Sequence, residues 1–166
     1  VAAARILKGR AKFKIAGDVY DKNPHSLTRE QLRGWDKEGV VEWLGQVKDM
    51  PAVYKECSIF VLPSYYREGV PKVILEAMAT GRPIITTDMP GCRETVIDGE
   101  NGCLVRAKDP YDLADTIKSL LDDPEKTKEM GKKSRALAEK YFGVESVVSR
   151  TLGDYDHAME NGRRSK

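Results

Sequence analysis

The chain has 166 residues, with 28 Lys and Arg against 26 Asp and Glu, and its net charge at pH 7 is only +2. That length suits one domain with a buried core, and the basic residues are scattered among acids, so the massed positive charge of a nucleic-acid-binding protein is missing. No apolar run approaches the roughly 20 residues that a membrane-spanning helix needs, and no signal peptide is visible.

Cysteine and histidine form no metal-binding pattern in this sequence. Cys57, Cys92 and Cys103 are an odd number without metal-ligand spacing, and only His25 and His157 accompany them. We therefore expect no metal site, and reduced thiols of the kind found in a cytosolic protein. His25 belongs to a polar loop that we expect at the surface.

Strand-like and helix-like segments alternate along the chain, which predicts an α/β domain with a doubly wound parallel sheet. The candidate strands are Lys12–Ala16, Val40–Leu44, Ser58–Leu62, Pro83–Thr87 and Cys103–Val105. The candidate helices are Thr28–Lys37, Met50–Glu56, Pro71–Thr80, Cys92–Ile97, Pro110–Leu121, Glu125–Tyr141 and Val144–Met159. Thr28 and Gln31 predict a capping box at the start of the first of these helices.

The two ends of the chain raise separate expectations. The first residues, up to Gly9, indicate the end of an amphipathic helix, and residue 1 is Val rather than Met. Because a doubly wound sheet normally opens with a strand, we expect a fragment whose first, central strand lies upstream. Its place would be filled by strand 12–16 moving next to strand 58–62, or by self-association. The last helix, 144–159, carries an apolar stripe that needs a surface to cover it.

Residues 67–78 contain the most informative pattern in the chain. A strand ended by Pro63 leads into a loop with Gly69 and then into a helix started by Pro71, with Glu68 in the loop and Glu76 inside the helix. Proline suits the first helical position, where its missing N–H would have no partner. The next amides then point freely out of the helix start, which is a site that attracts phosphate.

The two glutamates each allow two interpretations. Glu68 is either a plain acidic cap or a group aimed at ligand hydroxyls. Glu76 is surrounded by apolar residues, so we expect it to be buried and to need a partner. That partner is either a nearby Lys, Arg or backbone amide, or a pair of sugar hydroxyls, and the chemistry alone leaves both open.

The neighbouring residues also allow two interpretations. Lys72 either adds a cation near the phosphate or is simply solvated. Arg93 and Glu94, beside Gly91, either face a ligand cleft or form a local surface pair. Tyr65, with its neighbour at position 66, either walls a sugar pocket or packs under the loop.

The stretch LPSYYREGVPKVILEAMATGRPIITTDMPGCRETVIDGENGCLV resembles the C-terminal domain of group 1 (family 4) retaining glycosyltransferases, which have the GT-B fold. Two glutamates with seven residues between them, here Glu68 and Glu76, match the signature of that family, and the segment WLGQVKD fits it as well. The resemblance covers roughly residues 12–142. It looks closest to bacterial enzymes that extend capsular polysaccharides or polyprenyl-diphosphate-linked glycans.

The resemblance implies that residues 1–166 form one nucleotide-sugar-binding C-terminal lobe, with a core at about 12–142 and a C-terminal helix at 144–159. The lobe would face an acceptor-binding N-terminal lobe that this chain lacks. The implied reaction moves a sugar from a nucleotide diphosphate-sugar, UDP-linked, to a glycan or lipid-linked acceptor with retention. No metal or cofactor is implied. The implied location is cytoplasmic, peripheral to the inner face of the plasma membrane.

The resemblance also implies a role for each site residue. Glu68 is the catalytic residue that holds donor-sugar hydroxyls, and Glu76 holds the ribose. The remaining donor-binding positions are the diphosphate cradle and the base contacts: Gly69, Val70, Lys72, Val73, Val47 and Asp49. Relatives carry an Arg and a Lys just after the first strand, upstream of residue 1 here, so we expect the isolated chain not to turn over and to bind nucleotide weakly.

Several other classes compete with this interpretation. A nucleotide-sugar epimerase of GT-B shape would share the sheet and the helix-start anion site but not the sequence around Glu68 and Glu76. A nucleotide-binding module without catalysis describes the chain in truncated form. A glycosidase would need a raised pKa on one carboxylate and no phosphate-binding helix start. A nicotinamide dehydrogenase is disfavoured because no GxGxxG follows any strand.

Overall fold

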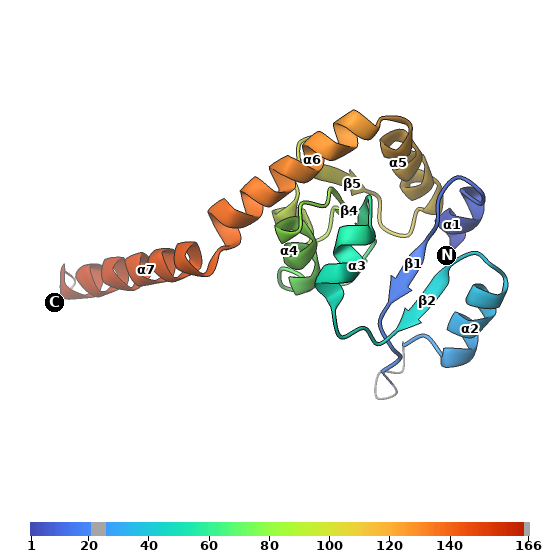
Figure 1. Cartoon of the computed structure of the whole chain (residues 1–166). Coiled ribbons are helices and arrows are strands. Elements are labelled where there is room, and N and C mark those ends of the chain that lie inside the picture. The colour runs from blue at the N-terminus through green and yellow to red at the C-terminus, as the bar shows by residue number, and fades with distance from the viewer. Residues whose placement is uncertain (21–25, 165–166) are drawn as a thin grey trace.

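In residues 1–20 and 26–164, which the computed structural model describes, five parallel strands form the middle of an α/β domain (Figure 1). They are β1 (Lys14–Ala16), β2 (Glu42–Gly45), β3 (Phe60–Leu62), β4 (Ile84–Thr87) and β5 (Gly102–Val105). The predicted α/β class and the parallel pairing are confirmed. His25 lies outside the described residues.

Helices surround the strands and join them in the alternating order that the sequence predicts (Figure 1). They are α1 (Ala2–Ile6), α2 (Arg29–Lys37), α3 (Met50–Glu56), α4 (Lys72–Ala79), α5 (Pro110–Asp122), α6 (Pro124–Leu137) and α7 (Val144–Arg164), with a 3₁₀ turn η1 (Arg93–Thr95) and a π-helical turn η2 (Ala138–Phe142). The capping box is present, since Thr28 Oγ1 accepts from the Gln31 amide at 3.2 Å and Gln31 Oε1 accepts from the Thr28 amide at 2.9 Å.

Strand β4 is the centre of the core because its residues alternate between two apolar layers. Ile84 belongs to the cluster under α3 and α4, whereas Ile85 belongs to the cluster under α1 and α5, and both are fully buried. Helices therefore cover both faces of the sheet, which is the doubly wound arrangement. A strand buried on both faces is expected to be continuously apolar or β-branched, as Ile-Ile-Thr-Thr is.

The strands form two separate sheets rather than one. Strand β1 pairs with β2, and β3, β4 and β5 pair in that order. The expectation that strand 12–16 moves next to strand 58–62 is wrong for the described residues, because the ladder joins Lys14 to Glu42 and Ile15 to Trp43 instead. Phe13, just before β1, and Val61 of β3 both pack against the same core cluster, so side-chain packing bridges the two sheets where no ladder joins them in the described residues.

Several predicted boundaries are corrected. The segment predicted as helix 92–97 is only the 3₁₀ turn η1, because Val96, with φ −125° and ψ 125°, is already in an extended conformation. The helix predicted at 125–141 begins at Pro124 and gives way to η2 at Ala138. The last helix runs on to Arg164, past the predicted end at Met159.

Helix α7 projects away from the rest of the molecule (Figure 1). The apolar stripe predicted for it is exposed at Val144, Val147, Val148, Leu152 and Tyr155. Its helical spacing is as predicted, and no surface of the described residues covers it.

Helix α6 packs on the turn between α4 and β4 through a glycine. A Cβ on Gly131 would lie 2.4 Å from the carbonyl oxygen of Gly81, closer than any real Cβ contact. Gly34, in the middle of α2, has no such neighbour within 4 Å. The two helix glycines therefore have different reasons to be glycine.

We expect Gly131→Ala and Gly34→Ala to change stability in opposite directions. Gly34→Ala should raise the free energy of unfolding by about 0.5–1 kcal/mol, since alanine is the better helix former. Gly131→Ala should lower it by about 1–3 kcal/mol, because the added methyl overpacks the contact with Gly81. Urea denaturation of both variants measures this, and a gain for both would contradict the packing argument.

Candidate functional site

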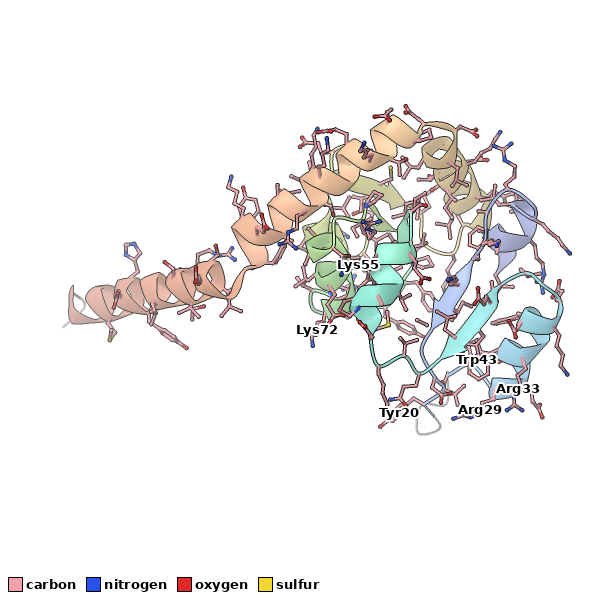
Figure 2. The ribbon with its side chains drawn as sticks, in the orientation of Figure 1. Tyr20, Arg29, Arg33, Trp43, Lys55 and Lys72 are labelled. Atoms are coloured by element: carbon pink, nitrogen blue, oxygen red, sulfur yellow. The ribbon has the colours of Figure 1, made fainter. Side chains whose placement is uncertain are left out.

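The sequence-predicted site lies at the carboxyl ends of the strands. The segment that contains Glu68 connects the end of β3 at Leu62 to the start of α4 at Lys72. In Figure 2 Lys72 lies on the lower side of the molecule, the side to which the arrows of β1 and β2 point in Figure 1. Open α/β sheets bind ligands at this edge.

The start of α4 is an uncapped helix end. Pro71 is the N-cap residue, with φ −68° and ψ 120°, and not the first helical residue as predicted, because its ψ is still extended. No side chain caps the helix, and no acid lies in its first turn. The Ile74 amide donates to the Pro71 carbonyl oxygen at 3.0 Å. Among the described residues, the amides of Lys72 and Val73 have no such acceptor, so the positive end of the helix is open to an anion.

Glu68 is exposed, but its carboxylate is held in place. Ser64 Oγ donates to Glu68 Oε1 at 2.9 Å, and the Ser64 carbonyl oxygen in turn accepts a hydrogen bond from Thr87 Oγ1. Ser64 follows β3 and Thr87 ends β4, so two neighbouring strands fix this acid. Gly69 and Val70, which follow it, are also exposed.

Glu76 is not buried as expected, because its side chain keeps 38% of its accessible surface. Tyr54 OH donates to Glu76 Oε2 at 3.0 Å, and Lys72 Nζ lies 3.5 Å from Glu76 Oε1. The predicted lysine partner is therefore present, one helical turn away, together with a tyrosine from α3. A carboxylate has about four acceptor positions, so these two contacts leave room for ligand hydroxyls.

The buried partner of Glu76 is Tyr54, which is only 2% exposed. The pKa of Tyr54 is raised to about 12, chiefly by burial and then by the hydrogen bond to the Glu76 carboxylate and the negative charge of that carboxylate. Tyr54 is thus a neutral donor that orients Glu76 throughout the physiological pH range, and it ties α3 to α4.

The two residues predicted at the nucleotide base lie in the segment between β2 and α3. Asp49 is the N-cap of α3, and its Oδ1 accepts from the Ala52 amide at 3.1 Å. Val47 is half-buried in the loop that precedes it. Asp49 therefore has a structural role of its own, and base binding by either residue stays a prediction.

Tyr65 and Tyr66 do not pack under the loop, since 45% and 52% of their surfaces are exposed. Their hydroxyl oxygens lie 3.0 Å apart, and Lys108 Nζ lies 4.6 Å from the centre of the Tyr65 ring. They form an exposed aromatic pair just before Glu68.

Sequence reasoning missed the three residues that hold the glutamates: Ser64, Thr87 and Tyr54. The hydroxyl residues directly after β3 and at the end of β4 were a usable signal, because polar side chains at the carboxyl ends of strands face the ligand edge. Nothing in the sequence of α3 distinguishes Tyr54 from an ordinary core tyrosine.

Other features of the described residues lie outside this site. A cavity of about 770 Å³ at the opposite end of the sheet, lined in part by Ser58, Pro83 and Leu120, includes none of the predicted site residues. The described residues contain no cluster of His, Cys, Asp and Glu that could hold a metal ion. None of their helices has the length and apolar content needed to cross a bilayer.

Comparison with known protein families shows to which family this chain belongs. Residues 1–123 match the family described as "Glycosyl transferases group 1". The chain belongs to the group 1 glycosyltransferase family.

Relatives of this group 1 glycosyltransferase chain include a Campylobacter jejuni enzyme named N,N'-diacetylbacillosaminyl-diphospho-undecaprenol alpha-1,3-N-acetylgalactosaminyltransferase. It is 33% identical over 159 residues, which are 96% of this chain and 40% of that protein. Spore coat protein SA of Bacillus subtilis is 37% identical over 66% of this chain and 29% of its own length. The chain thus spans less than half the length of these relatives.

Solved structures agree with the GT-B fold. Anabaena HepE, solved in complex with UDP, superposes with a TM-score of 0.79 at 25% identity, over 92% of this chain and 43% of that one. Sucrose-phosphate synthase from Thermosynechococcus elongatus gives a TM-score of 0.80 at 28% identity, over 96% and 41%. The C-terminal domain of a group 1 glycosyltransferase from Francisella tularensis gives 0.73 over 86% and 76%, at 24% identity, which supports the fold alone. The predicted match to a GT-B C-terminal domain is confirmed.

The raised pKa of Tyr54 predicts a specific loss of stability in alkali. Because the folded pKa of about 12 exceeds the ordinary value of 10.0, the contribution of Tyr54 is complete below pH 10 and is lost as the pH rises to 12. The loss should be about 1–3 kcal/mol of unfolding free energy. Urea denaturation between pH 9 and 12 should show it in the native sequence and not in Tyr54→Phe. Equal alkaline slopes in the two proteins would contradict the assignment.

Proposed function

We propose that this chain is the donor-binding lobe of a retaining glycosyltransferase that moves a sugar from a nucleotide diphosphate-sugar to a glycan or lipid-linked acceptor. The observation that carries the proposal is the uncapped start of α4 with Glu68 before it and Glu76 within it. The loop after β3 and the helix α4 together then offer groups for all three parts of a nucleotide-sugar: diphosphate, sugar and ribose.

The diphosphate would bind at the amides of Gly69, Val70, Lys72 and Val73. Cleavage of the glycosidic bond leaves negative charge on the departing diphosphate, and fixed backbone dipoles stabilise that charge without reorganising. The Lys72 side chain is 88% exposed and carries a positive charge at the same place. These groups favour the charge-separated transition state over the ground state.

The sugar would lie on the Glu68 side of the diphosphate. We assign Glu68 the role of orienting donor-sugar hydroxyls and stabilising positive charge at the anomeric carbon, not that of a nucleophile. Its support from Ser64 at 2.9 Å suits orientation, since one carboxylate oxygen is fixed and the other stays available.

The nucleoside would lie on the Glu76 side. Tyr54 and Lys72 fix this carboxylate from two directions and leave acceptor positions for the two ribose hydroxyls. Val47 and Asp49 are the proposed base contacts. The uridine diphosphate in the HepE complex supports a UDP-linked donor.

The acceptor would bind to a second lobe. This chain spans about 40% of the Campylobacter relative, whose name specifies a diphospho-undecaprenol-linked acceptor. We therefore propose a lipid-linked or glycan acceptor at the cytoplasmic membrane surface, with the catalytic cleft between the two lobes. The reaction needs no metal ion or cofactor in this proposal, because the α4 amides and Lys72 supply the positive charge.

Substitution of the two glutamates should produce different kinetic effects in the complete gene product. Glu76→Gln should weaken nucleotide-sugar binding about 10- to 100-fold, because the charged acceptor for the ribose is lost. Glu68→Ala should lower kcat by about 100- to 1,000-fold with a smaller change in nucleotide affinity. Calorimetry with UDP and product detection by mass spectrometry, after a screen of nucleotide-sugars, measure the two effects.

Glu100→Gln is the control for these variants, because Glu100 is an exposed acid at the other end of the sheet. It should leave both constants unchanged. Wild-type rates in both Glu68→Ala and Glu76→Gln would contradict the assignment. The isolated 166-residue chain should bind UDP weakly and transfer no sugar, so tight binding by it in calorimetry would contradict the need for further sequence.

A further inference from the structure

Gly91, in the turn after β4, lies against the backbone of the loop that contains Glu68. Gly91 is buried and has φ +89°, a conformation that L side chains rarely adopt. A Cβ there would lie 2.3 Å from the carbonyl oxygen of Glu68 and 2.5 Å from that of Gly69. The two loops are therefore in direct backbone contact, and any side chain at position 91 must displace the Glu68–Gly69 peptide.

Glu94 holds Gly91 in that position. The Gly91 amide donates to Glu94 Oε2 at 2.6 Å, three residues on. The turn is closed on its other side, where the amides of Cys92 and Arg93 both donate to the Met89 carbonyl oxygen at 3.0 Å. Cys92 is fully buried and anchors the turn in the core. The sequence suggested that Glu94 either faces a ligand cleft or forms a local surface pair. Its hydrogen bond with the Gly91 amide is a third role that differs from both.

The contact at Gly91 complements the support of the Glu68 carboxylate. Ser64 fixes the carboxylate at 2.9 Å and is itself held by Thr87. Gly91, four residues after Thr87, fixes the backbone of the same residue. Both supports come from the end of β4, so Glu68 is held at its side chain and at its main chain by one neighbouring unit.

We propose that Gly91 and Glu94 are positioning residues for the sugar-orienting acid Glu68, an inference that rests on the proposed function. They act by setting where the Glu68–Gly69 peptide lies and touch neither donor nor acceptor. A displacement of about 1 Å at a reacting group can cost about 100-fold in rate, so a methyl at position 91 is a sufficient perturbation.

Gly99 provides the matched control. It has φ +77°, the same left-handed conformation, but no atom lies within 4 Å of a Cβ built on it. Gly99→Ala therefore carries the backbone strain of the substitution without the steric contact. The difference in kcat between Gly91→Ala and Gly99→Ala therefore measures the effect of the steric contact with Glu68 and Gly69.

The test is steady-state kinetics on the complete gene product. Gly91→Ala should lower kcat about 100-fold relative to Gly99→Ala. Glu94→Ala should lower kcat in the same direction, and Glu94→Gln should restore it, since a glutamine oxygen still accepts from the Gly91 amide. In the Glu68→Ala background, Gly91→Ala should cause no further loss. A turnover of Gly91→Ala equal to that of Gly99→Ala, or an additive loss in the double variant, would overturn the proposal.

Two further readouts keep the result interpretable. If Gly91→Ala does not fold, the Glu94→Ala and Glu94→Gln pair decides alone, because it removes one hydrogen bond without adding volume. Amide hydrogen exchange in residues 64–72 should speed up in Gly91→Ala and Glu94→Ala but not in Gly99→Ala, and unchanged exchange overturns the inference. A wild-type protein that transfers no sugar from any nucleotide-sugar overturns the proposed function, whereas an active one with unaffected Gly91 and Glu94 variants overturns the positioning role alone.

Discussion

The open amides at the start of α4 are the interaction on which the rest of the site depends. A helix end attracts an anion only where no side chain of the protein occupies it. Pro71 meets this condition because, as N-cap, it has no side-chain acceptor to offer, and the first turn contains no acid. The same residue is buried, so the helix start is anchored, while Lys72 and Val73, the next two residues, are exposed. The local sequence thus keeps the positive end of the helix free at a modest cost in helix stability, about 1 kcal/mol for a missing cap.

An exposed loop must nevertheless be held in one position if it is to orient a substrate. The loop that contains Glu68 is held by residues at and just after the end of β4. Thr87 is fully buried and reaches Ser64, which reaches Glu68, while Gly91 abuts the Glu68 carbonyl. Strand β4 is the most deeply buried strand, with alternating residues in two apolar layers. The rigidity of the core is therefore transmitted to the loop through polar contacts at the carboxyl edge. Precise sites on rigid elements generally rely on such supporting contacts.

The sequence was sufficient for the fold class and for the order of the elements, because both depend on local patterns. Thr28 with Gln31 predicted a capping box, and the β-branched run at 83–87 predicted a strand; the structure contains both. The sequence alone was not sufficient to predict contacts that depend on how strands and helices are placed relative to one another. The Tyr54–Glu76 hydrogen bond joins residues 22 positions apart, and the approach of Gly91 to Glu68 joins two loops. The burial expected for Glu76 failed for the same reason: its apolar neighbours pack inward, but the face that carries it is half-exposed.

Two carboxylates beside the proposed diphosphate site would repel an anionic ligand unless their negative charges were balanced. The two carboxylates have different partners. Lys72 pairs with Glu76 at 3.5 Å, so the acid that lies inside the helix is partly neutralised and acts chiefly as a hydrogen-bond acceptor. Glu68 accepts a hydrogen bond from the neutral hydroxyl of Ser64, and no Lys or Arg of the described residues forms an ion pair with it. That difference suits the two roles proposed for them. A ribose is neutral throughout the reaction and needs acceptors, whereas the anomeric carbon gains positive charge as the diphosphate leaves, and a full negative charge nearby then stabilises the transition state more than the ground state.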